Sequence, residues 1–468
     1  MAKLYVFGIG GTGSRVLRSL TMLLAAGADA NGYTIVPIVI DPDHSNGNLT
    51  QTVTLMDEYV SIRNCLTFAG KNTNRFFSAK IEKILPNFTM PVNKTSNLKF
   101  REFIDLAGMQ DKANQAMARM LFSDDNLNSD MKVGFEGNPN IGSVVLNQIK
   151  KSHDFKQFAQ SFQPQDKIFI ISSIFGGTGA SGFPLLLKTM RRKDDSIPNN
   201  AAMNAAVIGA ITVLPYFKLS QDDDSPIDSA SFISKSKSAL AYYDRTIASN
   251  NEINALYFIG DTAAKTYDNI KGGVQQTNQA HAIELLSATA ILDFIHKDYS
   301  LTDHRFMELG VEDLTGALTL KSFYPGISKI IKYPLTQFAL FALGMDKDKT
   351  FLSSKQLKKN TDLGLDEHFY KTTFVDKVVG FLESYTGWLN EMKSNAVSLD
   401  MFNMGSDNPF EFITGIKAKK FLSVVSYNWD TYRTALNKSK VTTTQAEDMF
   451  MEMYFNGLET LCREKFNL

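Results

Sequence analysis

The chain has 468 residues, 44% of them hydrophobic, enough for two or three domains with substantial cores. Lysine plus arginine and aspartate plus glutamate both total 49, so the formal charge is zero and no global field favours a nucleic-acid partner or an anionic membrane. Only two cysteines occur, Cys65 and Cys462, which argues against a disulfide framework.

The sequence opens directly on the apolar residues 4–7, which leaves no room for a signal peptide. No apolar run approaches the roughly 20 residues that a membrane helix needs. We therefore expect a cytoplasmic protein without a membrane span. The six histidines are scattered without metal-ligand spacing, so no zinc site is expected.

The N-terminal part alternates strands and helices. Strand 4–7 leads into a glycine loop at 8–14, a helix from Ser14 to about Ala26, and a strand at 34–40. Short, nearly continuous apolar strands separated by helices predict a parallel sheet that is covered on both faces. The expected fold class is α/β, and ligands of such sheets bind at the carboxyl ends of the strands.

A second strand-loop-helix unit follows later in the chain. Strand 167–172 precedes a glycine loop at 176–182 and a helix from about 183 to 190. The apolar runs at 205–214 and 253–259 predict two more core strands.

Apolar residues at helical spacing predict a long central helix over 277–295. Beyond it we expect a strand-like region at 327–343, broken by Pro334, and a helical segment at 366–392. The capping box Thr444-Gln445-Ala446-Glu447 predicts the start of the last helix. The predicted organisation is an α/β domain at 1–275 that carries both glycine loops, a central connecting helix at 276–298, and an α+β C-terminal domain with terminal helices at 299–468.

Both glycine loops are candidate phosphate cradles. Glycines let the backbone approach an anion closely, their amides point at its oxygens, and the following helix contributes its positive end. Two converging loops could hold a triphosphate, with hydroxyls that either bind phosphate or cap the helix. The candidate phosphate-binding residues are Gly8, Gly10, Gly11, Thr12, Gly13, Ser14, Gly176, Gly177, Thr178, Gly179, Ala180, Ser181 and Gly182.

The segment Phe175-Gly176-Gly177-Thr178-Gly179-Ala180-Ser181-Gly182 resembles the GGGTGSG phosphate loop of the tubulin and FtsZ superfamily, with a phenylalanine in place of the first glycine. The first loop resembles the other phosphate loop of that family. Residues 134–142, Gly-Phe-Glu-Gly-Asn-Pro-Asn-Ile-Gly, are similar to its GAGxNPxxG loop, which reaches the terminal phosphate through positions matching Gly137 and Asn138.

The resemblance covers roughly the first 300 residues. It implies a bacterial, tubulin-like cytoskeletal GTPase that binds GTP or GDP with Mg²⁺. It also implies that the nucleotide state controls self-assembly or a partner, with homo-oligomers or filaments formed through head-to-tail contacts.

Three further residues are candidates for nucleotide contacts. Asp41 ends the second strand, where a carboxylate could hold a ribose hydroxyl or a magnesium-bound water, or could serve the turn that follows. In FtsZ an aspartate early in the central helix pairs with guanine, but an ungapped match puts Ala282 there. Asn278 and His281 lie nearby and could substitute, although a histidine on a half-buried helix is more often a packing residue.

Candidates for hydrolysis come from the loop after the central helix. In the superfamily that loop carries acidic residues that position water against the nucleotide of the next subunit. The stretch 298–305 offers Asp298 and Asp303, without the NxDxxD spacing of FtsZ. Either could orient water or be surface charge, and Asp303 is the favoured one.

Other functions compete with this interpretation. The N-terminal loop followed by Asp41-Pro42-Asp43 also looks like the ATP-binding half of ThiF-type adenylyltransferases. That pattern does not account for the second glycine loop. A nucleotide-binding scaffold that neither hydrolyses nor polymerises fits the divergent acidic loop. A nicotinamide dehydrogenase needs only one glycine loop.

Overall fold

The computed structural model describes residues 1–466 except 44, 69, 93–94, 96–97, 132–134, 136, 221–229, 262–265, 268–272, 312–316, 348–356 and 420–426. Its centre is a six-stranded, fully parallel sheet with the strand order β2-β1-β3-β4-β6-β8. The strands are β1 Lys3–Ile9, β2 Thr34–Ile40, β3 Lys167–Ser173, β4 Val207–Val213, β6 Ala255–Ile259 and β8 Arg305–Glu308. A separate pair joins β5 Lys218–Leu219 to β7 Thr266–Tyr267.

The expected α/β fold is therefore confirmed. The strands predicted at 4–7, 34–40, 167–172, 205–214 and 253–259 all belong to this sheet. Their near-continuous apolar character follows from burial, because both faces of the sheet are covered by helices. The edge strand β8 is mostly exposed. It lacks the apolar run that would predict it.

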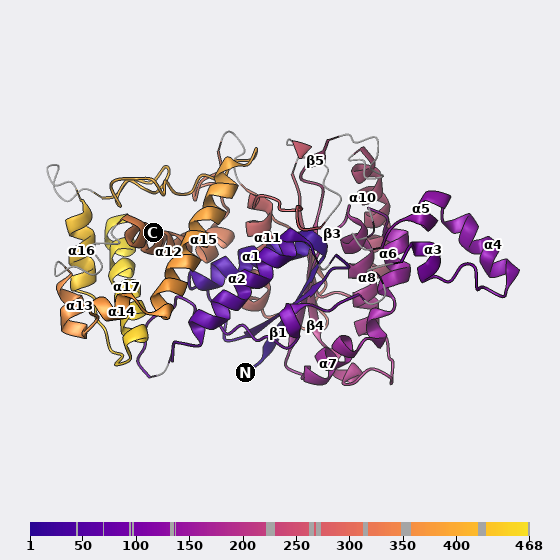
Figure 1. Ribbon diagram of the computed structural model, residues 1–468, viewed down its shortest axis with the longest axis horizontal. Helices are drawn as coiled ribbons and strands as arrows, with labels where there is room; N and C mark the ends of the chain where they lie inside the picture. The colour runs from indigo at the N-terminus through magenta and orange to yellow at the C-terminus, as the bar shows by residue number, and fades with distance from the viewer. Residues whose placement is uncertain are drawn as a thin grey trace.

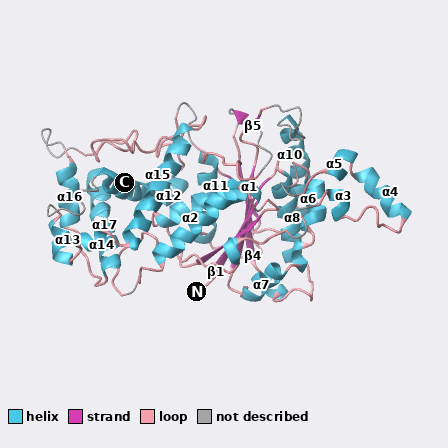
Figure 2. Cartoon of the chain, in the orientation of Figure 1, coloured by secondary structure: helices cyan, strands magenta, loops and turns pink. Residues whose placement is uncertain are grey.

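Helices lie on both faces of the sheet (Figures 1 and 2). One face carries α1, α2 and α11, and the other carries α6, α7, α8 and α10. Their bounds are α1 Gly10–Ala25, α2 Gly47–Arg63, α6 Pro139–Leu146, α7 His153–Ser161, α8 Gly177–Arg191, α9 Asn200–Asn204, α10 Ala230–Tyr243 and α11 Ala282–His296. Helices α3 Phe100–Phe103, α4 Lys112–Leu121 and α5 Asp124–Asn128 extend outward from the second face.

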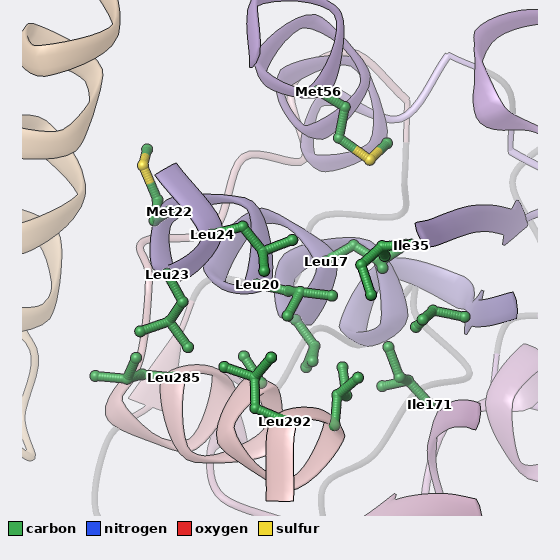
Figure 3. Packing of buried hydrophobic residues seen from close by; sticks show 14 of the residues in the cluster. Leu17, Leu20, Met22, Leu23, Leu24, Ile35, Met56, Ile171, Leu285 and Leu292 are labelled. Atoms are coloured by element: carbon green, nitrogen blue, oxygen red, sulfur yellow. The ribbon is translucent and has the colours of Figure 1, made fainter. Parts of the chain in front are cut away.

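Helix α1 is buried between α2 and α11 (Figure 3). Leu17, Leu20 and Leu23 of α1 and Leu285 and Leu292 of α11 are at most 3% exposed. Because α1 starts at the first glycine loop, this packing fixes the loop against the sheet.

Beyond β8 the described part of the chain is mainly helical and covers the α1, α2 and α11 side of the molecule (Figure 1). The helices are α12 Pro325–Lys347, α13 Lys358–Leu363, α14 Glu367–Tyr370, α15 Thr373–Ser394, α16 Trp429–Asn437 and α17 Ala446–Leu461. None of the helices in the described ranges combines the length and the apolar character that a bilayer crossing requires.

Two local predictions for this region are wrong. Residues 327–343 are part of α12, which contacts α11, α15 and α17, so its apolar residues occupy several faces and imitate the pattern of a buried strand. Helix α17 begins at Ala446 with Gln445 as its N-cap and without a side-chain capping bond, so the predicted capping box does not form.

Ion pairs and hydrogen bonds tie these helices to the sheet side. Arg18 of α1 donates two hydrogen bonds, of 2.7 and 2.9 Å, to the carboxylate of Glu391 on α15. Glu391 also accepts from the backbone N–H of Ala280 at 2.8 Å, and Asn395 donates to the carbonyl of Ala280 at 2.9 Å. The C-terminal end of α15 therefore holds the entry to α11.

Candidate functional site

The two glycine loops meet at one edge of the sheet. They follow the carboxyl ends of β1 and β3, which are hydrogen-bonded neighbours. The chain passes from β1 to β2 on one side and then crosses to β3 on the other, so the loops lie at a topological switch point, where open α/β sheets bind ligands. A Cβ atom placed on Gly10 would lie 3.4 Å from the Cβ of Thr178, which puts the two loops in contact.

Both loops provide helix starts without a side-chain cap. Helix α1 begins at Gly10 and α8 at Gly177, earlier than the predicted starts at Ser14 and 183. Their N-cap residues Ile9 and Gly176 have no side-chain oxygen that could accept from the first-turn N–H groups. The first-turn N–H groups of a helix have no partner within the helix. Two uncapped helix starts side by side therefore present a set of amides suited to a polyanion.

The third loop packs against the second. A Cβ on Gly177 would lie 3.1 Å from the backbone nitrogen of Asn138 and 3.2 Å from that of Gly137. Asn138 is the N-cap of α6 and accepts from the N–H groups of Asn140 and Ile141. Its side chain is thus engaged in capping, while Gly137 adopts a φ of +71°. Gly134 and Glu136 of the predicted loop lie outside the described residues.

The remaining glycines of the loops allow close packing. A Cβ on Gly13 would collide with Gly8, and one on Gly179 would lie 2.7 Å from the carbonyl oxygen of Ser173. A Cβ on Gly182 would lie 2.8 Å from Ile9, which is the last residue of β1. These three contacts explain why residues without side chains occupy those positions.

The loop hydroxyls divide into two groups. Ser14 donates to the carbonyl of Gly10 at 3.3 Å, and Ser181 donates to that of Gly177 at 2.7 Å. Both serines are buried and bond back to carbonyls of their own helices, so neither of them caps a helix start. The side chain of Thr178 faces Gly10 of the first loop instead, and Thr12 is 8% exposed.

The side chains of Phe175 and Ala180 in the second loop face α10. Phe175 stands where the family has a glycine, and its ring packs against Tyr216 and Phe232 rather than filling the loop. Ala180 lines a cavity on the α10 side of α8.

Asp41 lies at the same sheet edge. Ile40 pairs with Ile9, so Asp41 follows directly beside the first glycine loop. Its buried carboxylate accepts from the backbone N–H of Asp43 at 3.0 Å. Burial raises the pKa of Asp41 to about 7, the N–H of Asp43 opposes this rise, and the negative charge of Asp43 adds to it.

This pKa predicts a pH-dependent stability. Between about pH 4 and 7 the native Asp41 holds a proton that the unfolded chain has lost, so the free energy of unfolding falls as the pH rises and levels off above pH 7. We expect Asp41→Asn to raise the melting temperature at pH 8, where burial of the ionised carboxylate costs a few kcal/mol at about 1.4 kcal/mol per pKa unit. The same substitution should change the melting temperature little at pH 4, where Asp41 is protonated in the native protein and largely so in the unfolded chain. Scanning fluorimetry at both pH values checks this, and an equal shift at both would contradict it.

A polar wall faces the first loop from the segment before α11. Asn278 accepts from Asn48 at 3.0 Å and donates its own backbone N–H to Asn48 at 2.8 Å. It also accepts from Arg15 at 3.3 Å. Asn278 therefore lies near the start of α1, as its candidate role requires.

Arg15 is the main site residue that the sequence did not reveal. Its Nε donates to Glu284 at 2.5 Å and its Nη2 donates to Tyr216 at 2.6 Å, while Tyr216 donates to Glu284 at 3.2 Å. A Cβ on Gly11 would lie 3.8 Å from the guanidinium, which places this buried cation beside the first loop. Its position directly after Ser14 was the only signal in the sequence.

His281 has a structural role. It is the N-cap of α11, where its Nδ1 accepts from the N–H of Ile283 at 3.1 Å and Glu284 accepts from the N–H of His281. Its ring packs against Tyr216 and it is 3% exposed. The packing alternative for His281 is therefore the one that the structure supports.

Asp298 and Asp303 lie away from the glycine loops. They precede Arg305, the first residue of a parallel strand, and so belong to the amino edge of the sheet, opposite the edge that carries the loops. Asp303 accepts from the N–H and the hydroxyl of Ser300 at 2.8 Å each, and these bonds lower its pKa. Within one copy, neither aspartate reaches the candidate phosphate site.

No protein-family model and no curated protein matches the chain. Among solved structures it is similar to CetZ2 from Haloferax volcanii, a GTPγS-bound protofilament, with 12% identity and a TM-score of 0.29 over 63% of this chain and 58% of that chain. It is also similar to CetZ from Methanosaeta thermophila, with 16% identity and a TM-score of 0.29 over 65% and 57%. The chain thus spans less than two thirds of each, and likeness this distant assigns neither a family nor a function.

Proposed function

We propose that the chain is a tubulin-like guanine-nucleotide-binding protein whose nucleotide state controls self-assembly or a partner. The observation that carries this proposal is the contact between the two glycine loops, at Gly10 and Thr178, on the carboxyl edge of a parallel sheet. Two uncapped helix starts converge there, and the loop at Gly137 closes on them. A single phosphate needs one such start, whereas a polyphosphate uses all three segments.

The residues fit a nucleotide with magnesium. In the proposal, the first-turn amides of α1 and α8 bind the phosphates, and Asn278 is the candidate for the base. Magnesium in nucleotide sites is bound through one or two carboxylates together with phosphate oxygens, and Asp41 supplies such a carboxylate at this edge. Among the described residues no group of three or more His, Cys, Asp or Glu could hold a metal by itself.

Hydrolysis requires a second copy in this proposal. Asp298 and Asp303 lie at the edge of the sheet opposite the loops, so a head-to-tail neighbour is what would bring one of them to the nucleotide. The same argument supports filament assembly over catalysis by a single subunit. The division into 1–275, 276–298 and 299–468 and the cytoplasmic location stay parts of this proposal.

Equilibrium binding of fluorescent GTP and ATP analogues, with and without Mg²⁺, tests the proposal. We expect the fluorescent GTP analogue to bind only with Mg²⁺. Unlabelled GTP should displace it at a concentration at least tenfold lower than ATP requires, which corresponds to a difference in binding free energy of about 1.4 kcal/mol. Absence of any nucleotide binding in folded protein would refute the proposal.

The two alternatives have their own signatures. Exchange of pyrophosphate into ATP would favour the ThiF-type adenylyltransferase. GTP binding without phosphate release and without pelleting would favour the scaffold.

A further inference from the structure

Lys235 of α10 joins the third loop to the helices on the α8 side of the sheet. Its ammonium group donates a hydrogen bond of 2.9 Å to the carbonyl oxygen of Gly137, which lies 98 positions earlier in the chain. The side chain of Lys235 is half-buried, and α10 lies on the face that carries α6 and α8 (Figure 1). The structure therefore places a cation directly on the third loop.

The same ammonium group lies close to the start of α8. Lys235 lines a cavity of about 610 Å³ between α6, α8 and α10, and so do Gly176, Ala180 and Ser181 of the second glycine loop. The backbone nitrogen of Gly137, whose carbonyl Lys235 holds, lies 3.2 Å from a Cβ placed on Gly177. A phosphate bound by the first-turn amides of α8 is therefore within reach of this lysine.

The charges around the cavity favour an anion. Of the described residues that line it, Lys188 and Lys235 are charged, and none is an aspartate or a glutamate. Arg15, the cation beside the first loop, is instead paired with the carboxylate of Glu284. A partly apolar cavity with positive charges and no carboxylate in its wall has a positive potential. The α8 side of the site is thus the side that best accommodates additional negative charge.

Lys235 and the candidate base residue Asn278 lie on opposite sides of the glycine loops. Asn278 is hydrogen-bonded to Arg15 of α1, on the face that carries α1, α2 and α11. Lys235 belongs to α10, on the other face. A nucleotide whose base lies at Asn278 extends its phosphates from the start of α1 to the start of α8. The phosphate farthest from the base is then the one nearest Lys235.

We propose that Lys235 binds the γ-phosphate of GTP and thereby distinguishes GTP from GDP. This inference rests on the proposed function and names the residue that detects the nucleotide state. An ammonium group has three N–H donors, so Lys235 can hold the carbonyl of Gly137 and a phosphate oxygen together. Hydrogen bonds between two ionised groups are roughly twice as strong as neutral ones. Because GDP lacks the γ-phosphate, Lys235 contributes mainly to the affinity for GTP.

Binding of fluorescent GTP and GDP analogues to the full chain with Mg²⁺ tests this role. We expect Lys235→Gln to weaken GTP binding about tenfold or more and GDP binding about twofold or less, because glutamine can still donate to Gly137 but carries no charge. Lys235→Arg keeps the charge and should restore most of the GTP affinity. GTP binding by Lys235→Gln should also depend less on salt concentration than GTP binding by the wild type, since one charged contact is lost.

Two other lysines provide matched controls. Lys188 lines the same cavity eleven residues after Gly177, which is about 16 Å along the helix and twice the Debye length of about 8 Å at physiological salt. Lys237 is exposed on α10 and is not among the residues that line the cavity. Lys188→Gln and Lys237→Gln should therefore bind both nucleotides as the wild type does.

The outcomes separate this inference from the proposed function. Equal losses of GTP and GDP binding in Lys235→Gln, unchanged GTP binding in that variant, or the same loss in Lys188→Gln would overturn the role of Lys235 while the wild type still binds GTP. A wild type that binds no guanine nucleotide would overturn both. Melting temperatures report whether each variant folds. Lys235→Met, which keeps the length of the stem without the charge, gives the same test if glutamine destabilises the fold.

Discussion

Gly11→Val is expected to weaken nucleotide binding at least tenfold in a protein that folds as well as the wild type. A side chain at Gly11 meets only the guanidinium of Arg15, at 3.8 Å for the Cβ, and Gly11 does not have a positive φ, so the fold accommodates valine. The added methyl groups nevertheless fill the cradle above the first-turn amides of α1. We expect the affinity for GTP to fall at least tenfold, or about 1.4 kcal/mol.

The choice of Gly11 separates binding from folding. Gly177→Val is a poorer test, because a Cβ there lies 3.0 Å from the Cβ of Phe135 and displaces the third loop whether or not a nucleotide binds. Gly380→Val in α15 is the matched control, since nothing lies within 4 Å of its added Cβ, and it should bind as the wild type does. Titration with fluorescent GTP, beside melting temperatures, gives the result. Unchanged affinity in folded Gly11→Val would remove the first loop from the site.

The sheet could be predicted because its strands are buried on both faces. Runs such as 34–40 and 167–172 are apolar without alternation, and turn-forming or glycine-rich segments bound them. The starts of α1 and α8 were placed too late because glycine has a low helix propensity. Burial against the sheet overrides that preference for the first turns at Gly10 and Gly177.

The convergence of the glycine loops could also be predicted, since both follow parallel strands. The contacts around them could not. Arg15, Tyr216 and Glu284 are far apart in the sequence and belong to α1, the segment after β4, and α11. The packing of α1 against α11 brings Arg15 to Glu284, and the segment after β4 adds Tyr216. The sequence alone does not show which of these distant segments pair.

Breaking the ion pair between Arg15 and Glu284 is expected to cause the largest loss of stability. Both side chains are buried, at 7% and 1% exposure for the residues, and Tyr216 completes their hydrogen bonds. Removing one partner leaves an uncompensated charge in the core, at a cost of about 3–5 kcal/mol. We therefore expect Glu284→Leu or Arg15→Met alone to lower the urea midpoint and the melting temperature markedly.

The double variant Arg15→Met/Glu284→Leu distinguishes a charge effect from a packing effect. With both charges replaced by apolar side chains of similar size, no buried ion remains, and most of the lost stability should return. If instead the two losses add, the pair acts through shape and the charges are incidental. GTP binding of the double variant then reports whether the buried cation beside Gly11 also serves the phosphates. Recovered stability with weakened GTP binding is the result we expect, because the guanidinium of Arg15 is a buried positive charge 3.8 Å from a Cβ placed on Gly11 of the first loop.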